Sequence, residues 1–321
     1  MKWKMAALLV ALGIALSVSQ DAQAFPDRPI KLVVASPAGS PPDIVARLLT
    51  DKMSEILGQP VIVENRGGAG GIIGAKSVIA ADPDGYTLML GSTSTLLIAP
   101  LIYKNAGYNA ATFTPISRVA DSSEVLAVHR SVAAKSVAEL IALAKARPGA
   151  LNFASAGNGT LPHIEGELLK AQAKIDMNHV PYRGGGEALV ALLAGQVQVF
   201  FSTLTQLLPY IREDRLRGLA ITSATRSPLA PDIPTMVESG FDQFITTSIT
   251  TVVAPPNTPI EIRRQLSKAV AGALGSTEVQ RSLAKLGGEA RPSSPEELAS
   301  YLAEAQQRWA RIIAVTHISI D

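Results

Sequence analysis

No cysteine occurs anywhere in the chain. Thiol nucleophiles, thiolate metal sites and disulfide bonds are therefore excluded, because each needs a cysteine side chain. Aromatic residues make up only 5% of the chain, so few rings are available to stack on sugars or bases. Basic and acidic residues nearly balance, at 29 and 27, which leaves no strong field to attract nucleic acid. We therefore expect no nucleic-acid partner.

The N-terminus has the pattern of a secretory signal peptide. Lys2 and Lys4 precede an apolar run from Ala6 to Val18, and small residues follow at Ala22 and Ala24. The run is short for a membrane span, which needs about 20 apolar residues, although an N-terminal anchor is the alternative reading. We predict that residues 1–24 are cleaved off after Ala24 and that the mature protein is periplasmic, with no membrane anchor after cleavage.

Apolar periodicity predicts strands that alternate with helices. An apolar-type strand over 30–35 is followed by helical spacing over 41–57, and the alternation continues with strands at 60–63 and 86–90 and a helix at 71–81. It resumes with a helix at 137–146 and ends with helices at 260–274, 278–286 and 295–315. Alternation of this kind is typical of an α/β protein whose parallel sheet is covered on both faces.

Two long extended runs, at 115–128 and 244–254, suggest that the chain crosses twice between two domains. The first domain would hold residues 25–122 and 250–321, and the second would hold residues 123–249. The crossover strands would form a hinge, with ligand held between the carboxyl ends of two sheets. One large α/β domain is the alternative.

The strongest functional signal is a pair of strand, glycine-rich loop and helix units, at 151–163 and 180–187. A helix that begins in such a loop leaves amide groups unpaired, and its dipole favours an anion there. We predict that amides of Ala156, Gly157, Asn158, Gly159 and Thr160 bind an anion. Thr160 is the expected N-cap, and His163 would either contact a carboxylate or brace the loop. Neither loop ends in the Gly-Lys-Ser/Thr of a nucleotide-binding P-loop.

The first strand ends in a loop with two possible roles. Ser40 and Asp43 have the spacing of a capping box, and Pro41 suits the first helical position. The same helix end could bind ligand through Ala38, Gly39, Ser40 and Asp43, although Pro41 and Pro42 lack amide hydrogens. We expect further contacts from the hydroxyls of Ser92 and Thr93, and from Tyr182.

Signatures of catalysis, metals and nucleotide cofactors are absent from the sequence. The glycines at 67–74 do not fit the dinucleotide pattern G-x-G-x-x-G and indicate a tight turn instead. His163 and Glu167 are four residues apart and could share one face of a helix, but two ligands make a poor metal site. The four histidines are not otherwise expected to cluster. We expect no cofactor, no metal and no enzymatic activity. An exported hydrolase or lyase that uses Ser155, His163 and Asp43 is the alternative.

Several motifs resemble a known family. They are FPDRPI at 25–30, VENRGGAGG at 63–71, PDGYTL at 83–88, SAGNGTLPH at 155–163 and VPYRGGG at 180–186. In this order, and over essentially the whole mature chain, they resemble the Bug receptors, which are the periplasmic solute-binding proteins of tripartite tricarboxylate transporters.

The resemblance implies a two-domain periplasmic-binding-protein fold of the Venus-flytrap type (type II), with ligand captured by closure of the hinge. It implies a small carboxylate ligand and delivery to a two-component membrane permease; a sensory receptor of the same fold is the alternative. We expect the protein to be a monomer. Where the family often has Asp-Asn, this chain has Ser202 and Thr203. Ser202 is therefore an expected ligand contact, and the missing Asp favours a carboxylate without an amino group.

Overall fold

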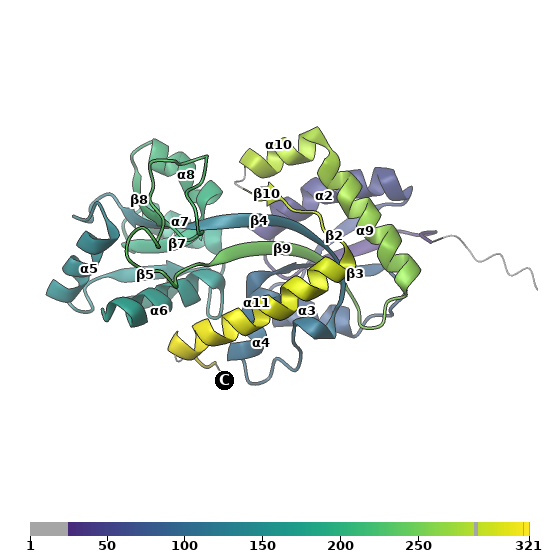
Figure 1. Cartoon of the computed structure of the whole chain (residues 1–321), viewed down its shortest axis with the longest axis horizontal. Helices are drawn as coiled ribbons and strands as arrows, with labels where there is room; N and C mark the ends of the chain where they lie inside the picture. Colours follow the sequence, from purple (N-terminus) through teal and green to yellow (C-terminus); the bar gives the residue numbers. More distant parts are fainter. Residues whose placement is uncertain (1–24, 286–287, 317, 321) are drawn as a thin grey trace, which may run out of the picture.

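The structure is a computed structural model that describes residues 25–285, 288–316 and 318–320. The predicted signal peptide, at 1–24, lies outside the described residues. The α/β fold of two halves joined by crossing strands is confirmed (Figure 1). Among the described residues, no helix is both long enough and apolar enough to cross a membrane.

The first half begins with alternating strands and helices, as the periodicity predicts. Ser40 precedes α2 as its N-cap, and Gly58 ends that helix in the left-handed conformation that glycine adopts without a Cβ clash. The elements are β1 (Ile30–Val34), α2 (Pro41–Leu57), β2 (Val61–Asn65), η1 (Ala69–Gly71), α3 (Ile72–Ile79), β3 (Thr87–Ser92), the π-helical turn η2 (Ser94–Ile98), α4 (Ala99–Ile102) and η3 (Ala110–Thr112).

A long strand, β4 (Thr114–His129), leads into the second half. Helix α5 coincides with the predicted helix at 137–146 and begins at Ser136, whose hydroxyl accepts a hydrogen bond from the amide of Glu139. The elements are α5 (Val137–Ala146), β5 (Asn152–Ser155), α6 (Leu161–Ala173), β6 (Asn178–Pro181), α7 (Gly185–Leu193), β7 (Val199–Thr203), α8 (Leu204–Arg212) and β8 (Leu216–Ile221).

The chain then returns through a second crossing strand to the first half. Three helices follow it, each within two residues of its predicted bounds at either end. The elements are β9 (Thr247–Ala254), α9 (Ile260–Gly275), α10 (Thr277–Lys285), β10 (Gly288–Ala290) and α11 (Pro295–Thr316).

The sheet is mixed, whereas the sequence predicts a parallel sheet. Its order is β2-β1-β3-β9-β4-β7-β5-β6, with β8 and β10 also pairing β4. Strands β2, β1 and β3 are parallel in the first half, and β7, β5 and β6 are parallel in the second. The crossing strands β4 and β9 are antiparallel to each other and to their other neighbours, because one carries the chain out of the first half and the other brings it back.

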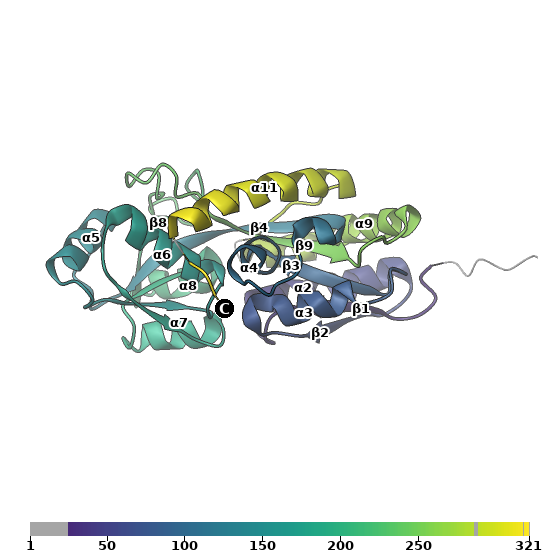
Figure 2. The same ribbon diagram turned by 90° about the horizontal axis from the view of Figure 1, so that it is seen from below.

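Strand β4 changes partners in its middle. Ser123 is opposite Thr247 of β9, whereas Glu124 is opposite Thr203 of β7. The hydrophobic core follows the same division, with one cluster around β1 and α2 and another around β7 and α8. A third cluster runs through both halves, and α11 packs against it, with contacts from β4 and η2 to α6. Figure 2 shows α11 lying across both halves.

Candidate functional site: a cavity between the two halves

A cavity of about 540 Å³ lies between the two halves. The carboxyl ends of parallel strands meet at one edge of a sheet, so the topology brings the following loops together. Loops after β1, β2 and β3 line it from the first half, and loops after β5, β6 and β7 line it from the second. The lining residues are 35–37, 40–42, 67–71, 92, 94, 95, 103, 124, 156–158, 160–162, 182–185, 200, 202, 203, 206 and 248.

The loop between β1 and α2 is closed by its own hydroxyls. The Oγ atoms of Ser36 and Ser40 are 2.7 Å apart, so Ser40 makes no side-chain cap bond to the helix. Its amide donates to the carbonyl of Pro37. The predicted capping box is therefore wrong: Asp43 accepts from the amide of Gly39, one residue before the N-cap, because the amide of Ser40 is already engaged.

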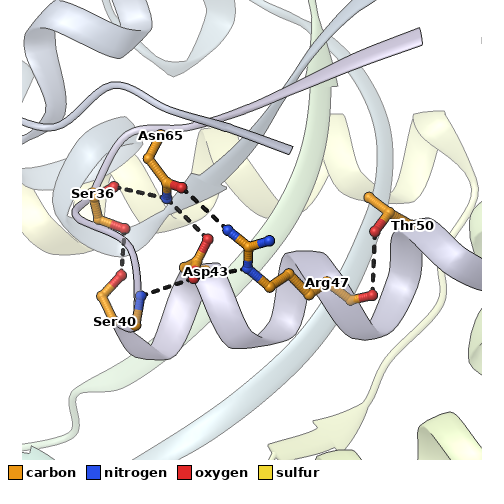
Figure 3. Close-up of polar contacts among 7 residues, drawn as sticks. Ser36, Ser40, Asp43, Arg47, Thr50 and Asn65 are labelled. Carbon is orange, nitrogen blue, oxygen red and sulfur yellow. Dashed lines mark hydrogen bonds and ion pairs between the residues drawn. The ribbon is translucent and has the colours of Figure 1, made fainter. Parts of the chain in front are cut away.

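Asp43 anchors this loop from the first turn of α2, between Ser40 and Asn65 (Figure 3). Its carboxylate accepts hydrogen bonds from the amide of Gly39 (2.8 Å), from Arg47 Nε (3.1 Å) and from Asn65 Nδ2 (2.9 Å). Burial by itself raises the pKa of Asp43, but these bonds outweigh it and lower the pKa below its ordinary value. Asp43 is 2% exposed and does not line the cavity, so it holds the loop in shape.

The loop between β5 and α6 uses most of its amides internally. Gly157 donates to Ser155 Oγ, Gly159 donates to His163 Nδ1, and Thr160 donates to the carbonyl of Gly157. The prediction that these three amides are free for an anion is therefore wrong. Within the part of the chain that the structure describes, the amides of Ala156 and Asn158 have no hydrogen-bond partner.

A layer of aromatic rings supports that loop from behind. His163 and His179 stack with ring centroids 4.1 Å apart, Phe153 stacks on His179, and Ser155 Oγ lies 2.6 Å from His179 Nε2. Burial lowers the pKa of His163 to about 4 and that of His179 to about 3, so both rings are neutral near neutral pH. Two of the histidines do cluster, contrary to expectation, because neighbouring β5 and β6 bring their segments together.

The three residues of the hydrolase alternative are not brought together. Ser155 pairs with His179 rather than His163, and the acceptor nitrogen of His163 is occupied by the amide of Gly159. Asp43 belongs to the first half and is bound by Arg47 and Asn65. Among the described residues there is also no group of histidines and carboxylates that could hold a metal ion.

The other predicted residues divide between the cavity and the framework around it. Thr93 joins β3 to β9, since its hydroxyl donates to the carbonyl of Thr247 and accepts from the amide of Ile249. The residues predicted to bind ligand that line the cavity are Ser40, Ser92, Ala156, Gly157, Asn158, Thr160, Tyr182 and Ser202; those that do not are Ala38, Gly39, Asp43, Thr93, Gly159 and His163.

Sequence reasoning missed two residues that connect the halves across the cavity edge. The amide of Leu161 donates to Ser94 Oγ at 3.0 Å, and the hydroxyl of Tyr103 donates to the carbonyl of Asn158 at 2.9 Å. Ser94 could have been found, because it continues the Ser/Thr run that begins at Ser92. Tyr103 has no such signal, since it follows a short helix that the periodicity did not indicate.

The glycines at 67–71 also line the cavity, although we interpreted them only as a turn. Gly71 has φ +96°, and a Cβ there would lie 2.3 Å from Thr95 Oγ1. This close approach explains the glycine and brings bare backbone to the cavity wall. Gly184 and Gly185, in the second glycine-rich loop singled out from the sequence, line the cavity as well, and Gln206 and Ser248 are further lining residues that the sequence did not reveal.

Glu124 is the most unexpected lining residue. It is only 3% exposed, and burial raises the pKa of its carboxyl to about 8. Behind it, Glu165 is fully buried, and burial together with the charge of Glu124 raises the pKa of Glu165 well above its ordinary value. The sequence shows Glu124 only as one acid within an extended run, with no motif to mark it.

Comparison with known proteins adds function to this geometry. Residues 45–318 match the family model of the tripartite tricarboxylate transporter family receptor. BugT of Bordetella pertussis (strain Tohama I) is 36% identical over 310 residues, which cover 96% of this chain and 94% of BugT.

Two solved structures are similarly close to the chain. Rpa4515 of R. palustris, solved with adipate, is 33% identical with a TM-score of 0.86, covering 92% of this chain and 99% of the other. MatC (Rpa3494) of Rhodopseudomonas palustris, solved with bound malate, is 34% identical with a TM-score of 0.85, covering 90% of this chain and 100% of the other. The fold, the cavity and these relatives together show that the chain belongs to the tripartite tricarboxylate transporter receptor family, as a periplasmic solute-binding receptor of the Bug type.

Proposed function

We propose that the protein captures a small organic carboxylate in the cavity between its halves and delivers it to a two-component membrane permease. The observation that carries the proposal is the cavity itself, which is walled by hydroxyls and glycine-rich backbone next to the unengaged amides of Ala156 and Asn158. Backbone amides near the start of α6 favour an anion. The adipate and malate in the two related structures support this ligand class.

The proposed contacts come from both halves. Ser40 and Ser92 face the ligand from the first half, and Asn158, Tyr182 and Ser202 face it from the second. The cavity volume of about 540 Å³ lies within the range of ordinary small-molecule sites. A ligand held by both walls stabilises their approach, which is the energetic basis of capture by closure.

The proposed hinge is the pair of crossing strands β4 and β9. Each passes between the halves as continuous backbone, so a small rotation of either strand moves one half against the other. We propose domains of residues 25–122 with 250–321, and of residues 123–249. The bonds from Tyr103 to Asn158 and from Leu161 to Ser94 join the halves beside the cavity, so they would break as the cavity opens and form again as it closes.

The proposed setting is the periplasm, after signal-peptide cleavage following Ala24, with the mature protein acting as a monomer and without chemistry on its ligand. A pull-down of membrane proteins with ligand-loaded receptor distinguishes a permease partner from a sensor.

Titration calorimetry of the mature protein tests the proposal. The panel contains succinate, malate, adipate, citrate, glutamate and benzoate, with neutral succinamide as the matched control for the charge. We expect at least one carboxylate to bind and succinamide to fail, with a fall in the radius of gyration on saturation measured by X-ray scattering. Absence of binding to every acid, or steady conversion of a bound acid into product, contradicts the proposal.

A further inference from the structure

Glu124 lies where the backbone passes from one half to the other. Its carbonyl accepts a hydrogen bond from the amide of Thr222 at 3.0 Å, which fixes the main chain. Its side chain lines the cavity. Within the part of the chain that the structure describes, the carboxyl makes no hydrogen bond and no ion pair, and burial raises its pKa. A carboxyl this deeply buried without a partner in the protein is left to hydrogen-bond with whatever occupies the cavity, water or ligand.

Glu165 on α6 stands behind Glu124 and shares its environment. Its Oε1 accepts a hydrogen bond from Thr246, while its Oε2 is buried without a partner among the described residues. Thr246 is in turn bonded to Thr222, the residue that holds the backbone of Glu124. The two carboxyls thus belong to adjoining segments of one buried network.

Two buried carboxyls without a cation retain protons. Ionising either one places an uncompensated charge in a low-dielectric environment, and ionising both adds repulsion. The pKa of each is accordingly raised, that of Glu124 to about 8. Near neutral pH, Glu124 therefore presents an O–H donor to the cavity.

Charged groups on the surrounding elements do not offset this pair. Strands β7 and β9 carry no titratable residue. Among the described residues, Arg183 is the one basic side chain on the cavity wall, where Tyr103 and Tyr182 also lie. Several charged groups on neighbouring elements are engaged in contacts of their own. These contacts join Asp121 to Arg118, Arg217 to the carbonyls of Val132 and Ala134, Glu167 to Lys170, Arg212 to the carbonyl of Leu229, Glu187 to the amide of Arg183, Glu289 to Arg291, and Arg263 to Glu296.

We propose that Glu124 determines ligand specificity by donating a hydrogen bond from its protonated carboxyl to an oxygen at the inner end of the ligand. The site then selects an acid with a second carboxylate or a hydroxyl at that end over an acid with an ammonium group or an alkyl chain there. This inference rests on the proposed function, because it assumes a carboxylate in the cavity. It adds which chemical group the site selects at the inner end of the ligand.

Two matched ligand pairs test the proposal by calorimetry. Malate and aspartate differ by a hydroxyl and an ammonium group, and adipate and hexanoate differ by the second carboxylate. We expect the wild-type protein to prefer the first member of each pair. Glu124→Met, which matches the side chain in length but lacks a donor, should weaken diacid binding about 10- to 100-fold, the effect of losing a hydrogen bond to a charged group.

Glu124→Gln keeps an N–H donor at the same position and should hold diacid affinity within about threefold of wild type, since a neutral donor replaces a neutral donor. Wild-type affinity should be level below about pH 7 and fall above about pH 8, as Glu124 loses its proton. The Gln variant should show no such fall. Glu165→Gln, the control in the same network, should retain the diacid preference because its side chain does not line the cavity.

Different results separate the two proposals. If wild type binds none of the acids, the proposed function fails. If wild type binds a diacid but Glu124→Met binds it equally well, or if aspartate binds more tightly than malate and Glu124→Gln abolishes that binding, the role of Glu124 as a donor is overturned. Thermal unfolding establishes that each variant is folded. Should the Met variant not fold, the Gln variant and the pH profile still decide the question.

Discussion

Asp43 illustrates how a charged residue near a binding site can serve its shape. The carboxylate accepts hydrogen bonds from the amide of Gly39 and from the side chain of Asn65. The side chain of Asn65 also donates to the carbonyl of Ser36 (Figure 3). These bonds link the start of α2 to the end of β2. A residue expected to touch ligand thus fixes the loop that does line the cavity.

Asp43→Asn should lower the free energy of unfolding by about 1–3 kcal/mol, because the amide brings an N–H toward Asn65 and Arg47, where acceptors are needed. Urea denaturation at neutral pH measures the loss. Asp51→Asn, at an exposed position on the same helix, is the matched control and should change little. Equal effects at the two positions would contradict the anchoring role.

Asn158 offers a test of a single amide. The bond from Thr160 to the carbonyl of Gly157, with Gly159 at φ +75°, makes residues 157–160 a type II turn. Proline is common at the second position of such a turn, which Asn158 occupies. The substitution Asn158→Pro therefore removes an N–H without disturbing the loop.

We expect Asn158→Pro to leave the melting temperature unchanged while it weakens carboxylate binding about 10- to 100-fold, the effect of losing one hydrogen bond to a charged acceptor. Calorimetry on the folded variant gives the affinity. The control is Asn158→Ala, which retains the amide and should bind nearly as well as wild type. Unchanged affinity in the proline variant would show that this amide does not contact the ligand.

At the scale of elements, the sequence reveals the crossing strands and the last helix themselves, but not the packing of that helix. The extended runs that form β4 and β9 are visible in the sequence, and so is the helical spacing of α11. The docking of α11 across both halves is not visible. Its apolar stripe would read the same if it packed on the first half alone, since periodicity shows which face is buried but not what covers it.

Trp309 carries much of that docking, being 2% exposed within the core cluster that spans both halves. Trp309→Ala should lower the free energy of unfolding by about 3–5 kcal/mol through lost burial and a cavity. Circular dichroism during urea denaturation follows the change without relying on tryptophan fluorescence. Gln307→Ala, on the exposed face of the same helix, should have almost no effect, and a comparable loss there would contradict the packing argument.

At the scale of the whole molecule, two buried pairs make opposite demands on pH. His163 and His179 stay neutral in the folded protein, with pKa values of about 4 and about 3 against an ordinary 6.5. Below about pH 6.5 the unfolded chain binds protons at these histidines that the folded protein does not, so their contribution to the free energy of unfolding is lost as pH falls. Glu124 and Glu165 keep their protons in the folded protein, with raised pKa values against an ordinary 4.5. Above about pH 4.5 the unfolded chain releases these protons and the folded protein does not, so their contribution to the free energy of unfolding is lost as pH rises.

Between about pH 4.5 and 6.5 the two effects oppose each other, and stability should be nearly level. From about pH 6.5 to 8 the histidines are neutral in both the folded and the unfolded state, so they do not change the free energy of unfolding with pH. The two glutamates alone act in this range, and the free energy of unfolding should fall as pH rises. Urea denaturation over this range measures the profile. Glu165→Gln keeps an acceptor for Thr246 and should reduce the alkaline loss; a wild-type profile that rises from pH 6.5 to 8 would contradict the assignment.

The sequence by itself determined the alternation of strands and helices, the two crossing segments and the glycine-rich loops, because each depends on local periodicity or backbone freedom. Only the tertiary structure decided which loop amides are engaged, which histidines stack, and that Glu124 lies unpaired on the cavity wall. These outcomes depend on contacts between distant segments, and burial then sets the charge of Glu124 and Glu165. No local pattern encodes such a contact, since the same residues would be solvated and ionised in an isolated segment.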